Sequence, residues 1–437
     1  MQNVNFLKKI KKEIYGKQQQ ANILFPPGFA EVCNTEVKYI INNLFLKNDD
    51  QPEVILNKKY LTLKNISFYS LVEVLLRAKS ISDLRYVIKQ KKVLNKDKLK
   101  KLFDELNLSI YFSQQQKYKI KVESTCSTFY HEGAIKKCVE DVFLEKGFLL
   151  ASGEDVFDTT VYLELYKDYL TLSVSLVGHV QALRGYKENL KSLAPLKEEI
   201  AYCATEQVFK EFSLNISDVD TIFVPFAGSG TFIFEYFLAY YHFSPALFKK
   251  NYALEKMPCF NLKHFLFLKE KFKDVFLTLF KKQKKLSFLY NDSSLKEFNT
   301  FKANYEFFIE KVSLLFEEEI GFLEAHLASE DTFNMDILKL IKPNGFVFLP
   351  INPPFGYRLS KQSDITALYK KIGKLIRKLA DDCKQKNISL LGFILCPSEE
   401  SWEFFLKSLS LQNVKTVHFS IAGKDMRLCM FSSLVLS

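Results

Sequence analysis

Four consecutive residues, Asn352, Pro353, Pro354 and Phe355, form a turn directly after the apolar stretch 345–351. Consecutive prolines remove two backbone donors and fix φ, so the carbonyl oxygens of this turn remain free to accept hydrogen bonds. The Asn352 side chain supplies another acceptor, and Phe355 supplies a flat face. Such a turn suits a planar ring with an amino group, whose nitrogen lone pair points outward at an electrophilic methyl group. Methyl transfer to such an amine depends mainly on positioning. The alternative to a functional site is an ordinary Pro-Pro loop.

A glycine turn provides a second candidate site. An apolar strand runs into Ala-Gly-Ser-Gly-Thr and then into a helix, so the backbone can approach a ligand closely and Thr231 can cap the helix. No Gly-Lys-Ser/Thr follows and the third glycine of a dinucleotide fingerprint is missing. A carboxylate-bearing ligand such as S-adenosylmethionine fits this pattern. The residues of the turn are Pro225, Phe226, Ala227, Gly228, Ser229, Gly230 and Thr231.

Acidic residues follow the next two strand-like stretches. Asp292 ends the stretch 286–292, where an acidic side chain can bind a ribose, although it could equally cap the next helix. Glu330 and Asp331 end the stretch 321–331 and could reach an adenine amino group.

The elements that must position these residues change in character near 178–194. After Gly178, strand-like runs alternate with long helical patterns, which predicts a parallel sheet with helices on both faces. Before it, the pattern is mixed α+β: a helix over 67–88, a strand over 117–127, and two strands over 161–178 that meet at Lys167-Asp168. We therefore expect one domain over 1–178 and another over 179–437.

Composition and charge narrow the function classes. The chain has 437 residues, is 48% hydrophobic and carries a net charge of +11, so disorder is excluded as its main state. Thirteen basic and three acidic residues lie between Lys58 and Lys101. This segment, which includes Lys89, Lys91 and Lys92, predicts attraction to a polyanion, the alternative being a solvated lysine-rich surface.

Other features argue against other classes. The eight cysteines form no C-x-x-C and no zinc-ligand spacing, so we expect no metal. The N-terminus lacks the apolar core of a signal peptide, which predicts a cytoplasmic protein. The stretch 221–243 carries one formal charge, Glu235, and has the length of a membrane span. Its Pro225 and glycine cluster instead favour a strand, a turn and a helix.

These motifs together resemble those of the THUMP-domain RNA guanine-N2 methyltransferases, which include the bacterial 23S rRNA enzymes. VPFAGSGTFIFE, Asp292 with Lys302-Ala303-Asn304, and NPPFGYRL carry the resemblance, as does GHVQALRGYKENLKSLAPLKEEIA over 178–201. FPPGFAEVCNTEV and KIKVESTCSTFYHEGAIKKCV match the first half of the family more weakly. The resemblance spans about 25–430, and no second methyltransferase domain would follow.

The resemblance implies an α/β fold: a Rossmann-like methyltransferase domain that uses S-adenosylmethionine, preceded by an α+β ferredoxin-like and THUMP region that binds RNA. Asn352, Pro353, Pro354 and Phe355 would hold the target guanine. Arg184 and Arg358 fall in family motifs and would contact RNA, with a structural ion pair as the alternative for each. The implied cofactor residues are Pro195, Leu196, Lys197, the glycine turn Pro225 to Thr231, Asp292 and Asp331.

One position departs from the family pattern. Where the family begins its glycine motif with Asp, this chain has Val224, which removes a carboxylate near the donor site. Three alternatives therefore stay open beside an rRNA enzyme. They are a tRNA guanine-N2 methyltransferase, an enzyme that methylates another amino group such as adenine N6 or a glutamine amide, and an RNA-binding assembly factor whose catalytic half has decayed.

Overall fold

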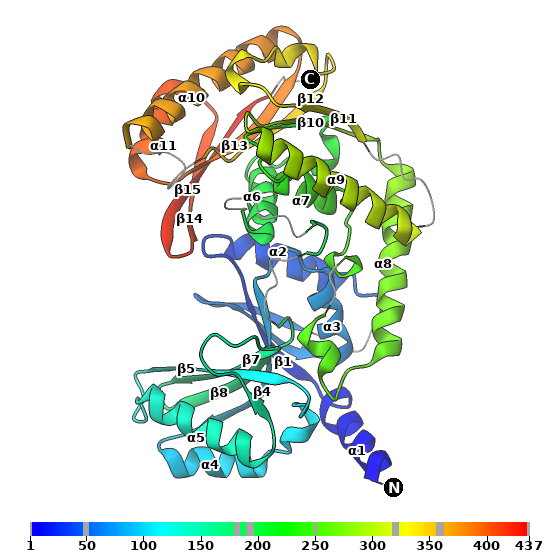
Figure 1. Cartoon of the computed structure of the whole chain (residues 1–437), viewed down its shortest axis with the longest axis vertical. Helices are drawn as coiled ribbons and strands as arrows, with labels where there is room; N and C mark the ends of the chain where they lie inside the picture. Colours follow the sequence, from blue (N-terminus) through cyan, green and yellow to red (C-terminus); the bar gives the residue numbers. More distant parts are fainter. Residues whose placement is uncertain are drawn as a thin grey trace. The chain divides into compact units, whose positions relative to one another are not determined.

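The computed structural model describes residues 2–46, 52–178, 184–188, 196–248, 251–316, 323–354 and 362–434 (Figure 1). The chain forms two compact units. The first contains residues 1–25, 33–183 and 249–271, and the second contains 26–32, 184–248 and 272–437. The main division at 183/184 lies close to the expected 178/179, but two segments, 26–32 and 249–271, belong to the unit opposite to the one expected.

The first unit is built on an eight-stranded sheet in the order β2-β3-β1-β4-β8-β7-β5-β6. Its strands are β1 Gln19–Leu24, β2 Glu53–Leu56, β3 Leu61–Ile66, β4 Asp83–Lys92, β5 Lys117–Thr125, β6 Leu149–Leu150, β7 Thr159–Tyr166 and β8 Tyr169–Ser175. Its helices are α1 Gln2–Ile10, the π-helix Lys11–Tyr15, α3 Phe68–Arg77, α4 Lys96–Glu105, the 3₁₀ turns Leu108–Ile110 and Ala253–Lys256, and α5 Glu132–Glu145. Helix α2, Ala30–Asn42, begins in the second unit and continues in the first.

One sequence-based prediction in this unit is wrong. The helix expected over 67–88 ends at Arg77, and Ala78 is already extended. The polar residues of Ser80-Ile-Ser-Asp interrupt the helical period, and the following residues alternate between the two faces of β4 in the middle of the sheet. The hairpin expected at Lys167-Asp168 is confirmed: both residues have positive φ, 49° and 65°, which suits a two-residue turn.

The second unit is built on a seven-stranded sheet in the order β11-β10-β9-β12-β13-β15-β14. Neighbours from β11 to β13 are parallel, and β15 is antiparallel to both β13 and β14. The predicted parallel sheet is therefore confirmed for β9 to β13, and helices alternate with strands along the chain, as expected. Its strands are β9 Thr221–Pro225, β10 Leu286–Asn291, β11 Leu323–Ala328, β12 Phe346–Ile351, β13 Ser389–Cys396, β14 Val414–Ile421 and β15 Lys424–Ser433.

Five helices follow the strands of this sheet or precede β9, and α8 connects the two units along the chain. They are α6 Glu198–Glu211, α7 Thr231–Tyr240, α9 Leu295–Phe316, α10 Gln362–Gln385, α11 Glu399–Leu409 and α8 Leu262–Lys282. The 3₁₀ turns of this unit are Ile216–Asp218, Pro245–Leu247, Thr332–Asn334 and Ile337–Lys339.

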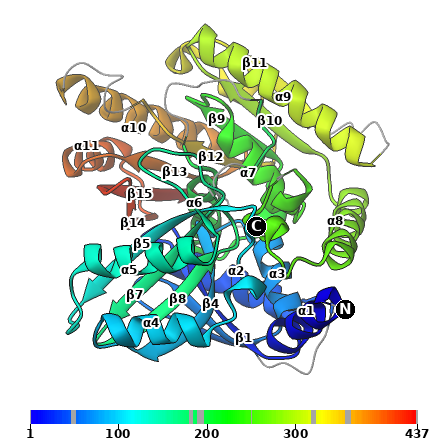
Figure 2. The same ribbon diagram turned by 60° about the horizontal axis from the view of Figure 1, so that its bottom comes forward.

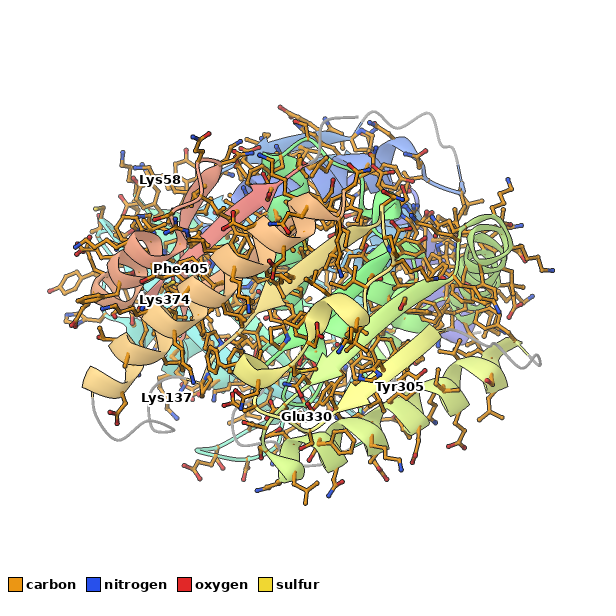
Figure 3. All side chains as sticks on the ribbon, turned by 90° about the horizontal axis from the view of Figure 1, so that it is seen from above. Lys58, Lys137, Tyr305, Glu330, Lys374 and Phe405 are labelled. Carbon is orange, nitrogen blue, oxygen red and sulfur yellow. The ribbon has the colours of Figure 1, made fainter. Side chains whose placement is uncertain are left out.

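Helices α10 and α11 lie side by side on one face of this sheet (Figures 1 and 3). A Cβ at Gly373 would lie 2.8 Å from the carbonyl oxygen of Phe405, so glycine allows the two helices to approach closely. The fully buried Tyr369 donates to the carbonyl of Leu395 at 2.6 Å. The result is a dense core beneath β12 and β13, which fixes the end of β12 where the NPPF turn begins.

The segment 26–32 packs against β14 within the second unit. Gly28 has φ +97°, and a Cβ there would lie 2.4 Å from the carbonyl oxygen of His418. The amide of Ser420 donates to the carbonyl of Pro27 at 3.2 Å. Phe29 is completely buried, with its ring centroid 5.3 Å from that of Phe419. The Pro-Pro-Gly turn therefore contributes to the core of the second sheet, although the first strand of that sheet, β9, begins only at Thr221.

Candidate active site

The glycine turn leaves the completely buried strand β9 through three positive φ angles: Phe226 at 56°, Gly228 at 52° and Gly230 at 81°. Gly230 is the residue that caps α7, and Thr231 is its first helical residue. The expectation that Thr231 caps the helix is therefore wrong. The amide of Gly230 donates to the carbonyl of Ala227 at 2.9 Å, and the cap residue is a glycine, which has no side chain to accept from the first amides of the helix.

Aromatic rings from β10 and α9 brace this turn. The Tyr290 hydroxyl donates to the Gly228 carbonyl at 2.9 Å, and its ring stacks on Phe301 with centroids 4.0 Å apart. A Cβ at Gly230 would lie 2.3 Å from Cδ2 of Phe301. The Asn304 amide donates to the carbonyl of Ser229 at 3.4 Å. Strand β10 and helix α9 thus hold the turn in place through Tyr290 and Phe301. The sequence alone indicated no role for either residue.

Asp292 lies at this turn, as expected. One carboxylate oxygen accepts from the amide of Gly228 at 2.9 Å. The other accepts at 2.9 Å from the amide of Ser294, the residue directly before α9. The carboxylate therefore joins the turns that follow β9 and β10. Both interpretations of Asp292, as a residue of the ligand edge and as a local cap, have a basis in these contacts.

The end of β11 is tied to the same edge by Asn291, the last residue of β10. Its side chain exchanges hydrogen bonds with the backbone of Glu330, at 3.0 and 3.1 Å, and donates to the Thr332 hydroxyl at 2.7 Å. The adjacent Asp331 is exposed, and its carboxylate caps a 3₁₀ turn by accepting from the amide of Phe333 at 3.2 Å. Glu330 and Asp331 thus follow β11 at the carboxyl edge of the sheet (Figure 3).

Asn352 follows β12 at this same edge of the parallel sheet. Its side-chain oxygen is buried and has no hydrogen-bond partner within the described part of the chain. Pro353 is buried and Pro354 is half-buried. A buried acceptor without a donor is costly, so this oxygen fits a ligand that brings an N–H group. Phe355 and Arg358 lie outside the described residues, as does Pro195.

Arg184 does not face an RNA surface, so that expectation is corrected. It is 1% exposed, and its guanidinium lies 3.3 Å from the buried carboxylate of Glu235. The Tyr186 hydroxyl donates to the same carboxylate at 2.6 Å. Burial alone would lower the pKa of Arg184, but the carboxylate of Glu235 outweighs it and raises the pKa. The alternative of a structural ion pair is the one that the structure supports.

Lys187 connects this buried network to the glycine turn. Its ammonium donates to the Thr231 hydroxyl at 2.8 Å and to the Glu198 carboxylate at 3.2 Å. Leu196 and Lys197 directly precede α6, which begins at Glu198, so the segment expected near the donor site is linked to Thr231 through one lysine. Sequence reasoning missed Tyr186 and Lys187. The single charge of the apolar stretch 221–243, Glu235, was the signal that could have indicated a buried partner.

The basic segment 58–101 is divided between two environments. Three of its cations are buried or nearly so in ion pairs, Arg77 with Glu73, Lys79 with Glu36, and Arg85 with Asp83 and Glu164. Lys89 and Lys92 on β4 are exposed, and Lys91 forms an ion pair with Glu105 of α4. The segment therefore supplies fewer free cations than its sequence suggests.

The described residues lack two kinds of feature, a metal-binding cluster and a membrane-spanning helix. Among them, no three His, Cys, Asp or Glu side chains gather in a way that could hold a metal ion. No helix in the described ranges has the length and apolar character needed to cross a membrane.

Known proteins that resemble this chain are methyltransferases. No protein-family model matches the sequence. The chain is 29% identical over 224 residues to the ribosomal RNA large subunit methyltransferase K/L of Marinobacter nauticus, which covers 51% of this chain and 28% of that protein. It is 24% identical over 328 residues to the protein of the same name from Shewanella frigidimarina, covering 72% of this chain and 42% of that protein. The chain thus spans less than half the length of these curated relatives.

Solved structures match over nearly the whole chain. SMU.472, a methyltransferase-type protein in complex with SAH, has a TM-score of 0.68 at 16% identity, covering 96% of this chain and 100% of that one. TrmN from Thermus thermophilus has a TM-score of 0.58 at 11% identity, covering 95% and 100%. The sheet order, the glycine turn after β9 and these structures define a Rossmann-like methyltransferase fold. The curated relatives are large-subunit rRNA methyltransferases of the K/L type, which confirms the resemblance indicated by the motifs.

Proposed function

We propose that this chain transfers a methyl group from S-adenosylmethionine to the exocyclic N2 of a guanine in structured RNA. The names of its relatives favour 23S rRNA as that RNA. The observation that carries the proposal is the buried side-chain oxygen of Asn352, which has no hydrogen-bond partner among the described residues. It follows β12, the strand next to β9, so it shares the carboxyl edge of the sheet with the glycine turn.

The glycine turn and its neighbours fit the cofactor. Open sheets of this kind bind ligands outside the carboxyl ends of their strands, where the strand order reverses, and β9 lies at that point here. Residues 225–231 would hold the methionine part against the start of α7, with Asp292 and Asp331 nearer the nucleoside. The segment before α6 would also approach the cofactor, through Pro195, Leu196 and Lys197. When bound, the cofactor supplies an electrophilic methyl group.

The NPPF turn would hold the base. Asn352 accepts a hydrogen bond from the target amine, the carbonyls beside Pro353 and Pro354 accept another, and Phe355 stacks on the ring. These contacts orient the nitrogen lone pair toward the methyl group. The amine proton becomes acidic as nitrogen attacks, so no strong general base is required and the main contribution is positioning. The target base would have to leave its stack to reach this turn.

We assign RNA binding to the first unit, as a ferredoxin-like and THUMP region. The exposed Lys89 and Lys92 support this assignment, Lys91 adds a partly neutralised cation, and Arg358 would contribute from the catalytic side. An rRNA substrate implies a cytoplasmic protein. A tRNA substrate and another acceptor amine are the nearest alternatives, because the NPPF turn would hold either amino group.

A second candidate is an RNA-binding factor without transfer activity. Val224 favours it: this residue replaces the acidic one of the family motif and is 1% exposed within β9, so it offers the ligand no polar group.

The decisive experiment measures both halves of the proposal on one sample. Calorimetry with S-adenosylmethionine tests the donor site, and tritium transfer to total RNA followed by nucleoside analysis identifies the product. Micromolar binding together with labelled N2-methylguanosine supports the enzyme. Binding with label on another nucleoside overturns the guanine assignment, and RNA binding without cofactor binding moves the conclusion to the decayed factor.

A further inference from the structure

Three strands of the first sheet, β5, β7 and β8, have one apolar face and one polar face. On β7 and β8, Leu163, Leu165, Leu170 and Leu172 are at most 3% exposed. The same face of β5 carries Tyr118, whose ring centroid lies 5.8 Å from Phe143 of α5. Helices α4 and α5 therefore cover this face (Figure 2). The alternate residues point to the opposite face.

Two tyrosines stand on that opposite face, at the end of the sheet where β7 turns into β8. Tyr166 is 57% exposed and Tyr169 is 61% exposed. They are direct partners in the β7–β8 register, so their Cβ atoms lie on the same side of the sheet. Lys92 is the partner of Tyr169 on β4, is exposed and lies on the same face. Adjoining exposed aromatic rings form an apolar patch, a feature that marks interaction sites.

The backbone that carries the rings is fixed by hydrogen bonds. Asp168 accepts from the amide of Thr128 at 2.6 Å, and its carbonyl accepts from the amide of Val93 at 2.8 Å. These bonds join the β7–β8 turn to the end of β4 and to the loop after β5. A fixed scaffold presents aromatic rings at low entropic cost on binding.

The charges beside the rings favour an anionic partner. The ammonium of Lys167 lies 5.4 Å from the ring centroid of Tyr166. Asp168, the acidic residue of the turn, is occupied by the amide and hydroxyl of Thr128. Lys92 and Lys167 thus flank the rings. Each carboxylate on this side has a donor or a cation: Asp168 has Thr128, Glu164 has Arg85 and Glu123 has Lys59.

An unsatisfied acceptor lies one step further along the same face. Glu164 is two residues before Tyr166, so it points to the same side of β7. One of its oxygens accepts from Arg85 at 3.1 Å. The other is buried and has no hydrogen-bond partner among the described residues, and the same holds for the hydroxyl of Ser173. Both atoms are covered by the protein itself, so they belong to the interior beneath this face.

We propose that Tyr166 and Tyr169, with Lys92 and Lys167, form a surface that binds unpaired nucleotides of RNA; we call it the tyrosine surface. Bases stack on the rings, and the lysines contact the phosphates. Stacking of this kind tolerates any sequence, because every base has a π-face. The inference rests on the proposed function in one respect, that the substrate is RNA.

The test uses the full chain and fluorescence anisotropy with a labelled single-stranded oligo-adenylate and a blunt RNA duplex of equal length. Tyr166→Leu/Tyr169→Leu should weaken binding of the single strand about tenfold or more and leave duplex binding unchanged. Tyr166→Phe/Tyr169→Phe should retain it, because the rings remain. Tyr39→Leu, an exposed tyrosine of α2 that is 49% accessible, is the matched control.

Salt separates stacking from charge. Lys92→Gln/Lys167→Gln should reduce the slope of log affinity against log salt by about 1.4, the value for two phosphate contacts on a single strand, whereas the tyrosine variants should leave the slope unchanged. Equal single-strand affinity for the leucine variant and the wild type overturns the proposal, as does equal loss for duplex and single strand. If the wild type binds no RNA at all, the proposed RNA substrate fails as well, and cofactor binding distinguishes that outcome from a misfolded sample.

Discussion

The hydroxyl of Tyr290 donates a hydrogen bond to the backbone carbonyl of Gly228 across 2.9 Å. Tyr290 is the penultimate residue of β10, and Gly228 lies in the turn that follows the neighbouring strand β9. A strand residue thus fixes the conformation of a loop from an adjacent βα unit. The ligand edge of the second unit is held in shape by contacts within the protein itself.

Replacing Tyr290 by Phe should weaken S-adenosylmethionine binding about fivefold. The change removes one hydrogen bond of about 1 kcal/mol while the ring still stacks on Phe301. Calorimetry gives the affinity, and Tyr305→Phe is the control, since Tyr305 is a half-buried tyrosine that also packs on Phe301. Equal affinities for the two variants would show that the Tyr290 hydroxyl does not support the site.

Gly230→Ala should destabilise the second unit by at least about 2 kcal/mol, because the new methyl group would lie 2.3 Å from Phe301 at a φ of +81°. Gly423→Ala is a matched control: its φ is +77°, and nothing lies within 4 Å of the added methyl group. Urea unfolding of both variants separates the cost of the backbone angle from the cost of the clash. Similar losses in both would mean that Phe301 moves aside readily.

Asn352→Ala should reduce methyl transfer at least roughly 100-fold through loss of positioning and leave cofactor binding unchanged. Transfer of labelled methyl groups to RNA is the measurement, with calorimetry on the same preparation. Asn215→Ala, at an exposed position of the second unit, serves as the control. Normal transfer by the Asn352 variant would remove the NPPF turn from the proposed site.

Glu235→Gln should cost about 3–5 kcal/mol of unfolding free energy, because it leaves the buried guanidinium of Arg184 without its counter-charge. The shape of the side chain is retained, so packing loss is small. Glu403→Gln, which breaks the exposed i,i+4 pair with Lys407, should change stability by no more than about 0.5 kcal/mol. Chemical denaturation of the two variants decides whether the Arg184 network has the structural weight assigned to it.

The carboxyl of Glu36 gives a pH dependence with a defined sign. Burial would raise its pKa, but the ammonium of Lys79 and the donors of Ser80 and Lys79 outweigh burial and hold the pKa below the ordinary 4.5. A lowered pKa in the folded state contributes stability above the unfolded-state value, and that stability is lost as pH falls through the folded-state value.

Glu36→Gln should therefore lower the melting temperature most above about pH 5, and the difference from wild type should shrink as the pH falls below 4.5. Melting curves from pH 3 to 7 provide the measurement. A difference that stays constant over this range would mean that the carboxylate is not held in its charged form by these partners.

The motif-bearing strands of the second unit were predictable because each is a short apolar run that ends in turn residues, as in 221–231 and 345–354. The helix expected over 67–88 was not predictable as a helix plus β4, because Leu84 to Ile88 is as apolar as the helix before it. Only its position between β1 and β8 makes that segment a strand.

The sequence indicated the residues of the candidate site that lie in turns after strands, but not the residues that support those turns. The types of Asp292 and Asn352 and their places after strands indicated the carboxyl edge of the sheet. Tyr290 and Phe301 could not be found, since an aromatic residue in a chain with 42 Phe and 21 Tyr carries little information by itself. Arg184 was misassigned because burial depends on a partner, Glu235, that lies 51 positions away.

The packing of Phe29 against Phe419 has a consequence for synthesis. The two residues are 419 − 29 = 390 positions apart, so the ribosome produces the first long before the second. At about 5–20 residues per second, Phe29 waits roughly 20 to 80 seconds for its partner strand to emerge. During that interval a phenylalanine that ends completely buried has no β14 to cover it, and we expect the nascent chain to be a client of chaperones until translation ends.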